Sequence, residues 1–304
     1  PIIDNMDLKL SEFGWGAVCV RGFIPPAAFM ELQSLGILPI AADMRTIDHL
    51  TYTPAPDIVH EAAGHAPILA NQEYADYLRK YGEVANKAIA SDKDLAVYYA
   101  IRELSDIKEN PASDNEMILK AEDNLNNAIA NVNYVSEAAY LSRMNWWTVE
   151  YGLIGNKNNF KIYGAGLLSS VGESQNCLSE SITKIPFSID CINKSYNITE
   201  PQPQLFITHS FDSLSNALDE MKEQMAFYLG GSKGLQKAID SKTICTIEFE
   251  SNIQVSGIVN SFIDNNNNLS YIQLSGPVQL CRYGNEIPLH GASYHSDGYG
   301  TTIG

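Results

Sequence analysis

Short apolar runs and short helical patterns alternate in the first seventy residues. Residues 15–24 predict a short strand followed by a loop. A proline pair and a glycine bracket residues 27–35, which favours a helix there, because proline suits the first helical turn and glycine the position after the last. A second apolar run covers 37–42. We expect a further helix over 53–69 that starts in a proline-rich stretch.

The middle of the chain has mostly helical patterns. From 72 to 130, charged residues interleave with leucine, isoleucine, tyrosine and alanine, and the sequence PASD at 111–114 predicts a break between two helices. Further helices are expected over 136–154 and 211–229, and after the glycine turn that begins at 164. The 211–229 segment carries an apolar stripe at helical spacing, which indicates core packing. The stripe consists of Leu214, Leu218, Met221 and Met225.

The pattern changes to β near the C-terminus. Residues 243–281 alternate apolar and polar side chains, as half-buried strands do, with an asparagine-rich turn at 264–268. The predicted fold class is therefore mainly α (α+β). A helical domain with short strands is expected over 1–231, followed by a small β-barrel or sandwich-like domain over 232–304 whose role the sequence leaves open.

Composition excludes several classes of protein. The 304 residues carry a formal net charge of −16, which argues against binding to nucleic-acid phosphates. No apolar stretch is long enough to span a membrane, so no membrane association is expected. The five cysteines are scattered and odd in number, which favours a reducing cytoplasm over a disulfide framework. A chain that begins Pro-Ile-Ile-Asp indicates a trimmed or truncated start.

Two of the six histidines, His60 and His65, lie five residues apart in the predicted 53–69 helix. Paired imidazoles are typical ligands of iron, copper, nickel and zinc. A spacing of five rotates the second ring by roughly 140° on a regular α-helix, whereas the zinc-protease motif uses four. Both rings can bind one metal only if the helix ends or distorts, and Gly64 and Pro67 bracket His65. The spacing therefore excludes a zincin.

A third protein ligand is needed, and Glu150 is the predicted one. It lies among apolar residues, where an unpaired carboxylate would be costly to bury and where metal coordination would offset that cost. Two histidines and one carboxylate leave three positions open, the arrangement of non-haem Fe(II) oxygenases. The alternative is that the histidines are structural and that Glu150 pairs with Arg143 or Arg45.

Three sequence blocks resemble the pterin-dependent aromatic amino acid hydroxylase family. They are TYTPAPDIVHEAAGHAPIL at 51–69, WWTVEYGLIG at 146–155 and KIYGAGLLSSVGESQNCLS at 161–179. The similarity covers roughly 15–228, including RGFIPPAAF and YNITEPQPQLF, and is strongest to the bacterial phenylalanine-hydroxylating branch. It breaks at 72–135, which we interpret as an elaborated helical section that forms a surface hairpin and adds little chemistry.

The resemblance implies that His60, His65 and Glu150 bind iron and that the rest of the site binds an aromatic amino acid. Arg45 matches the arginine that holds the substrate carboxylate; its alternative is a surface salt bridge with Asp43 or Asp48. Ser169 is also expected to orient His60. The remaining residues implied on the substrate side are Thr53, Pro56, Trp146, Tyr151, Gly166 and Ser169.

The resemblance also implies a tetrahydropterin beside the iron. Glu61 matches an acid next to both, and we expect Glu61, Trp146 and Ser169 to lie nearest the chemistry. The residues matching the pterin loop and its stacking aromatic are Gly22, Phe23, Ile24 and Phe29.

The implied function is an Fe(II)- and tetrahydrobiopterin-dependent (or related tetrahydropterin-dependent) monooxygenase that converts L-phenylalanine to L-tyrosine with O2. Tyr151 stands where phenylalanine is usual, so tryptophan or another aromatic amino acid is the alternative substrate, whereas the apolar Ile198 favours phenylalanine. Two other classes are alternatives: a metal-dependent hydrolase with Glu61 as general base, and a non-catalytic amino acid sensor. The role of the β region stays open. A dimerisation module and a docking module are the two candidates, and the first would make the protein a homo-oligomer.

Overall fold

The computed structural model describes residues 2–21, 24–47, 56–110, 112–132, 134–196, 198, 201–265 and 268–303. The chain forms two compact units. Unit 1 comprises Pro1–Lys87, Tyr99–Asn127 and Ala139–Lys222, and unit 2 comprises Ala88–Tyr98, Ala128–Ala138 and Glu223–Gly304. The domain boundary expected at 231/232 therefore falls inside unit 2. Among the described residues, no helix is both long and apolar enough to cross a membrane.

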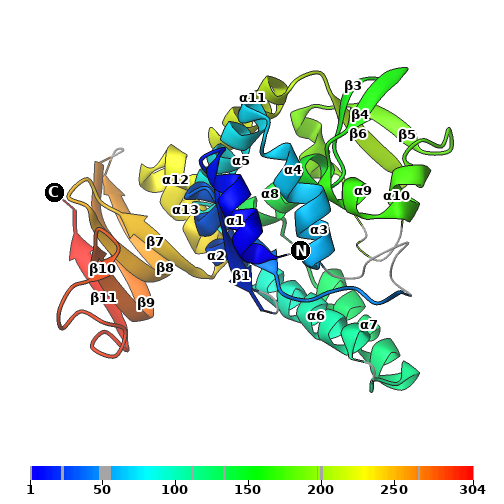
Figure 1. Cartoon of the computed structure of the whole chain (residues 1–304). Helices are drawn as coiled ribbons and strands as arrows, with labels where there is room; N and C mark the ends of the chain where they lie inside the picture. Colours follow the sequence, from blue (N-terminus) through cyan, green and yellow to red (C-terminus); the bar gives the residue numbers. More distant parts are fainter. Residues whose placement is uncertain are drawn as a thin grey trace. The chain divides into compact units, whose positions relative to one another are not determined.

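Unit 1 begins with a small two-stranded parallel sheet and two helices (Figure 1). The proline pair starts the second helix as expected, with Pro26 in its first turn. The strands and helices here are α1 (Ile3–Ser11), β1 (Gly16–Val20), α2 (Pro26–Ser34) and β2 (Ile37–Ala41).

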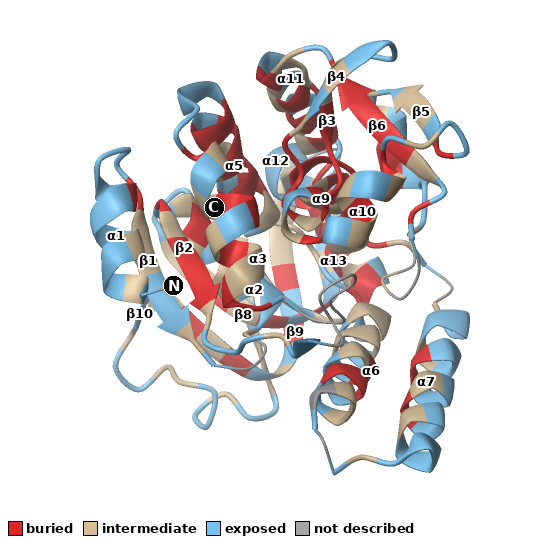
Figure 2. Ribbon diagram, turned by 45° about the vertical axis from the view of Figure 1, so that its right-hand side comes forward, coloured by how far each residue is buried: buried red, intermediate tan, exposed pale blue. Residues whose placement is uncertain are grey.

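The helical middle of the chain surrounds a buried aromatic cluster. The described helices that follow the histidine segment are α5 (Gln72–Ala85), α6 (Asp92–Glu109), α7 (Asn115–Ala130) and α8 (Glu137–Asn145). Tyr74, Tyr77 and Tyr81 on α5 are each 1% exposed, because residues three and four apart share a helix face. Tyr74 packs against Tyr163 and Phe211. α6 and α7 lie side by side as a hairpin whose outer faces are exposed (Figure 2).

A four-stranded mixed sheet completes unit 1, in the order β4-β3-β6-β5. Its elements are β3 (Leu153–Asn156), β4 (Asn159–Ile162), α9 (Ala165–Ser169), α10 (Val171–Asn176), β5 (Thr183–Pro186), the 3₁₀ turn η4 (Ile189–Asn193), β6 (Gln204–Thr208) and α11 (Phe211–Lys222). The sheet and α9 share a core that includes Tyr151, Leu153, Leu167 and Leu205, with Trp146 packed against it. This core holds α9 beside the segment that carries Glu150.

Unit 2 contains an antiparallel five-stranded sheet and a covering helix. Its elements are α12 (Ala226–Leu229), α13 (Gly231–Ser241), β7 (Ile244–Glu248), β8 (Ile253–Asn265), β9 (Asn268–Arg282), β10 (Asn285–Glu286) and β11 (Gly298–Thr302). Leu235 and Ala238 of α13 pack on Val255 and Val259. The described strands of this unit form one sheet, and α13 packs against it. The barrel or sandwich-like domain expected over 232–304 stays a prediction. The glycine-rich C-terminal end supplies β11, which pairs with β9.

Two predicted helices are shorter in the structure than in the sequence pattern. The helix expected over 136–154 ends at Glu150, and β3 begins at Leu153. The helix expected over 211–229 divides into α11 and α12, because Met225 adopts an extended backbone between them. Its apolar stripe is buried as predicted, with Leu214 and Met225 both fully buried.

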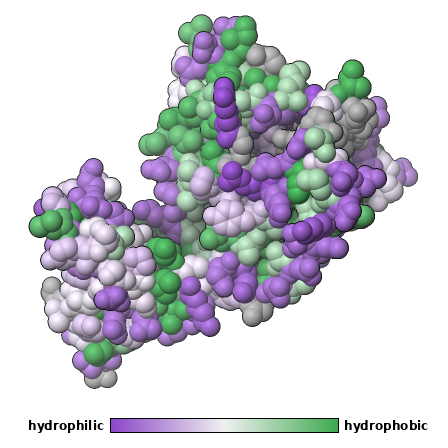
Figure 3. Space-filling model, turned by 90° about the horizontal axis from the view of Figure 1, so that it is seen from below, coloured by the Kyte–Doolittle hydropathy of each residue, from purple (hydrophilic) through white to green (hydrophobic). Residues whose placement is uncertain are grey.

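One buried carboxylate joins the three chain segments of unit 2. Glu137, 4% exposed, accepts hydrogen bonds from the backbone N–H groups of Ile89 and Ala226 and from Lys237 Nζ. Ile89 belongs to the first of these segments, Glu137 to the second, and Ala226 and Lys237 to the third. The surface of this β-rich unit, at the left of Figure 3, is mostly of intermediate hydropathy. This agrees with the exposed serine and threonine side chains of its strands, which are of intermediate hydropathy.

Candidate metal centre

The two histidines lie on a continuous helical segment that widens between them. α3 (Ile58–His60) leads into the π-helical turn η2 (Glu61–His65), and α4 (Ala66–Ile68) follows. The Ala66 N–H bonds to the Glu61 carbonyl five residues earlier, so the turn holds one more residue than an α-helical turn. Residues five apart then share a face. The sequence left two ways for both rings to meet one metal: the helix ends near His65, or it distorts there. The structure shows distortion, because the helix continues past His65.

Glu150 ends a second π-helical turn, η3 (Trp146–Glu150), which follows α8. Its wide turn is closed by the Tyr151 N–H, which bonds to the Trp146 carbonyl at 2.9 Å. Short π-helical insertions are often found at functional sites. Both helices that carry predicted ligands therefore have the same local distortion at the ligand.

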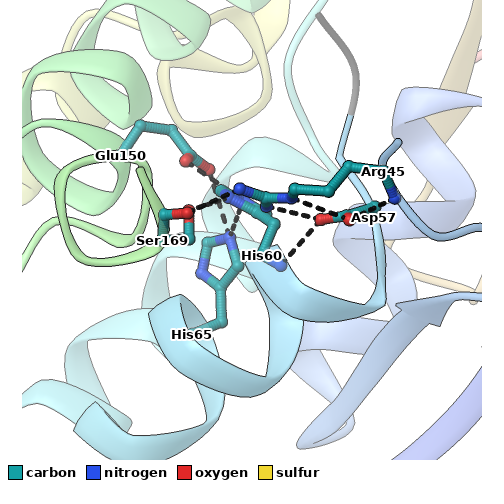
Figure 4. Close-up of polar contacts among 6 residues, drawn as sticks. All are labelled: Arg45, Asp57, His60, His65, Glu150 and Ser169. Atoms are coloured by element: carbon teal, nitrogen blue, oxygen red, sulfur yellow. Dashed lines mark hydrogen bonds and ion pairs between the residues drawn. The ribbon is translucent and has the colours of Figure 1, made fainter. Parts of the chain in front are cut away.

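The donor atoms of His60, His65 and Glu150 converge (Figure 4). The two Nε2 atoms are 3.0 Å apart, and they lie 3.4 Å and 3.3 Å from the two carboxylate oxygens of Glu150. A metal bound at about 2.1 Å by two ligands at right angles separates those ligands by about 3.0 Å. Among the described residues, these three form the only group of histidine, cysteine and acidic side chains close enough to hold a metal ion. The donor set and its spacing fit a first-row metal bound on one face.

Burial is the largest influence on the pKa of each donor, and it disfavours the charged form. Burial lowers the pKa of His60 to about 4. It raises the pKa of Glu150, but the nearby histidines and a backbone hydrogen bond from Gly166 outweigh it and bring that pKa to about 2. Burial also opposes the charge on His65, yet Glu150 raises the pKa of that ring to about 9. A proton on His65 thus balances Glu150, and a bound cation would replace it.

Helix α9 packs against the histidine turn closely enough to orient one ligand. A Cβ on Gly64 would lie 2.7 Å from the Ala165 carbonyl oxygen, so only glycine allows this approach. The packing brings Ser169 Oγ to 2.8 Å from His60 Nδ1. That hydrogen bond orients the ring so that Nε2 faces Glu150, as the sequence interpretation expected of Ser169.

Arg45 is held by Asp57, an acid that the sequence analysis did not suggest as its partner. Its Nη2 lies 2.6 Å from Asp57 Oδ1, its Nε donates to Asp57 Oδ2 at 2.9 Å, and both side chains are 4% exposed. Arg45 Nη1 also donates to the Ser169 carbonyl at 2.7 Å. Asp43 is exposed, and Asp48 lies outside the described residues. The surface salt bridge offered as the alternative is therefore wrong for Asp43.

Asp57 belongs to the site, although the sequence analysis did not single it out. It caps α3, accepting from the His60 N–H at 2.9 Å, while it grips Arg45. Burial raises its pKa, but the hydrogen bonds and charge of Arg45 lower it by more, so the net shift is downward. The other alternative, an ion pair between Glu150 and Arg143 or Arg45, does not occur: Arg143 donates to the Ile192 carbonyl instead.

Glu61 lies on the π-helical turn between the two histidines and is 5% exposed. Its Oε2 is buried without a hydrogen-bond partner among the described residues. Burial and the charges of Glu150 and Asp57 raise the pKa of Glu61 to about 7. The charge of His65 lowers this pKa, but by less. An orphaned buried carboxyl oxygen next to a metal site fits a ligand that supplies an N–H donor.

The expected aromatic wall of the site is larger than the sequence interpretation predicted. Trp146 stacks on Tyr151 with ring centroids 4.8 Å apart, and on Tyr196 at 4.3 Å. Its Nε1 donates to Gln202 at 3.3 Å. Tyr196 and Gln202 both lie in the matched segment YNITEPQPQLF but were not singled out. Gly166 lies beside the Tyr151 ring, where a Cβ would be 3.1 Å from it.

The structure does not bring every predicted residue to the metal ligands. Thr53, Gly22 and Phe23 lie outside the described residues. Pro56 is exposed, and Ile24 and Phe29 are half-buried, with no described polar or ring contact to a ligand. The roles expected for these residues stay predictions.

Fold and site together define a helical α+β protein in which two histidines and one carboxylate could hold a metal ion. The family model for biopterin-dependent aromatic amino acid hydroxylases matches residues 8–112 and 129–230. The chain therefore belongs to this family. Only 113–128 lies outside the match within that span, and it comprises most of α7. The wider elaborated section expected over 72–135 stays a prediction.

Similar proteins include several phenylalanine-4-hydroxylases. The chain is 30% identical over 220 residues to that of Chromobacterium violaceum, covering 71% of this chain and 59% of the relative. It is 27% identical over 248 residues to the phenylalanine-4-hydroxylase of Mesorhizobium japonicum, and the match covers 80% of this chain and 73% of that relative. A crystal structure of the Chromobacterium violaceum enzyme with iron(III) and 7,8-dihydrobiopterin matches with a TM-score of 0.55 and 30% identity, covering 73% of this chain and 66% of that one.

Ser169→Ala tests whether the hydroxyl orients His60. Removing Oγ leaves His60 Nδ1 without this partner, and lost partners of this kind weaken metal binding by about 10- to 100-fold. The affinity for Fe(II) or Co(II) is measured by competition with a chelator. Ser170→Ala is the matched control, since that hydroxyl caps α10 through the Glu173 N–H. Equal metal affinity in the two variants would show that the Ser169 hydroxyl has no such role.

Proposed function

We propose that the protein is an Fe(II)- and tetrahydropterin-dependent monooxygenase that hydroxylates L-phenylalanine to L-tyrosine with O2. The observation that supports this most strongly is the convergence of two imidazoles and one carboxylate, which leaves half of an octahedral metal open. Membership of a biopterin-dependent hydroxylase family and similarity to phenylalanine-4-hydroxylases support the reaction class. Iron and the pterin together would supply the activated oxygen.

The chain's own residues would position the substrate and exclude water. His60, His65 and Glu150 would hold the iron, and Glu61 would accept a hydrogen bond from the pterin. Trp146 and Tyr151 would border the aromatic ring, because both are on or next to the turn that carries Glu150. The ligand side chains are only 7–18% exposed, so few waters would reach the metal once substrate is bound.

Arg45 would bind the substrate carboxylate. A guanidinium has five N–H donors. Asp57 accepts hydrogen bonds from Nε and from one N–H of Nη2, and the Ser169 carbonyl accepts one from Nη1. The remaining donor on each terminal nitrogen could grip a carboxylate in a bidentate manner. Asp57 would then fix the guanidinium plane before the substrate arrives, which lowers the ordering cost of binding.

We also propose a cytoplasmic protein that binds neither nucleic acid nor membranes. The net charge of −16 and the five free cysteines support this. Self-association through the β-rich unit 2 is proposed on the sequence interpretation alone.

The proposed reaction is tested with purified protein, Fe(II), a reduced pterin, O2 and L-phenylalanine. Tyrosine should form in step with pterin oxidation, and Glu150→Ala should abolish it because the metal loses its carboxylate ligand. Glu12→Ala is the control, since Glu12 is an exposed partner of Lys9. L-Tryptophan and L-tyrosine are assayed alongside. Absence of tyrosine, or turnover that survives iron chelation, would contradict the proposal.

Arg45→Lys tests the carboxylate site. A lysine cannot keep the Asp57 contacts and grip the substrate carboxylate at the same time. Binding of L-phenylalanine should weaken by about 10- to 100-fold, whereas binding of phenethylamine, which lacks the carboxylate, should change much less. Calorimetry measures both. Arg79→Lys is the control, because Arg79 stacks on Trp15 and donates to the Gly14 carbonyl. Equal losses for both ligands would show that Arg45 does not recognise the carboxylate.

A further inference from the structure

Trp146 is held on both faces. Tyr196 stacks on it nearly parallel, with an interplanar angle of 9° and centroids 4.3 Å apart, and Tyr151 stacks at 29° and 4.8 Å. Two phenol rings at these distances cannot share one face of an indole without overlapping. They must therefore cover opposite faces, and the indole can present only its edge to anything else.

The edge of Trp146 is also fixed in rotation. Its Nε1 donates to Gln202, which is 2% exposed. A flat side chain that is stacked on both faces and hydrogen-bonded at one edge has a single orientation. Trp146 begins the π-helical turn that ends at Glu150, so this fixed indole and the carboxylate belong to the same short segment.

Tyr196 owes its position to several contacts between residues 192–196 and the α8–η3 segment. Arg143 Nη1 donates to the Ile192 carbonyl at 3.0 Å, and Trp147 Nε1 donates to the Lys194 carbonyl at 2.8 Å. The Tyr196 hydroxyl lies 2.7 Å from Ser142 Oγ. Ser142 and Trp146 are four residues apart, so the phenol lies along one helical turn with its hydroxyl at one end and its ring over the indole.

We propose that Tyr196 is a positioning residue that holds Trp146 edge-on in the aromatic pocket and thereby favours the phenyl ring of phenylalanine over the larger indole of tryptophan. This inference rests on the proposed function. An edge-on indole suits the face of a substrate ring, because aromatic edges are positive and faces negative. Without Tyr196, the indole of Trp146 can tilt, and the pocket widens for a bicyclic substrate.

The test compares Tyr196→Ala and Tyr196→Leu with Tyr196→Phe. The first two remove the flat partner of Trp146, whereas phenylalanine retains it and loses only the bond to Ser142. For the first two, KM for L-phenylalanine should rise more than kcat falls. The ratio of kcat/KM for L-phenylalanine to that for L-tryptophan should fall about 3- to 10-fold, the size of an aromatic pair contribution. Tyr196→Phe and Ser142→Ala should both keep this substrate ratio near the wild-type value.

Iron content and calorimetric binding of both amino acids are measured for every variant. If Tyr196→Ala fails to fold or to bind iron, Tyr196→Leu, which fills most of the space, gives the result. An unchanged substrate ratio in the folded variants, or an equal loss for Tyr196→Phe, would overturn the role of the ring. Wild-type protein that hydroxylates neither amino acid would instead contradict the proposed function, with the calorimetric preference still testing the role of Tyr196.

Discussion

The site depends on two helices that each widen by one residue where they carry a metal ligand. On a regular α-helix, His60 and His65 would point about 140° apart, and no metal could bind both. The π-helical turn η2 brings their Nε2 atoms to 3.0 Å. The turn η3 places Glu150 within 3.4 Å of both. A π-helical insertion is less favourable than a regular turn, so the surrounding packing must maintain both.

That packing links three segments, which carry Arg45, the two histidines and helix α9. Gly64 allows α9 to approach the histidine turn, and α9 then supplies Ser169 to His60. Arg45 connects the start of α3, through Asp57, with the Ser169 carbonyl. The same few contacts thus orient a metal ligand, cap a helix and preorganise a guanidinium for an anionic group.

The metal-binding residues could be predicted from the sequence better than the residues that hold the site in place. Rare histidines at an unusual spacing and a glutamate in an apolar segment indicated the ligands directly. Asp57 was missed as the partner of Arg45 because Asp43 and Asp48 lie much nearer to Arg45 in the sequence. Tyr196 contacts Trp146 fifty residues away, which no local pattern reveals. In unit 2, the glycines of GGSKGLQKAIDS disfavour a helical prediction, although this segment forms helix α13. The alternation of apolar and polar residues in the strands does not distinguish one helix-covered sheet from a sandwich.

The most direct test of this account is X-ray absorption at the iron edge of the Fe(II)-loaded protein. The converging donors predict a first shell of nitrogen and oxygen atoms only, at about 2.1 Å, with outer-shell scattering from two imidazoles. Glu150→Ala should change the first shell while both imidazole signals remain. A sulfur neighbour, or scattering from one imidazole or from none, would contradict the metal centre formed by His60, His65 and Glu150.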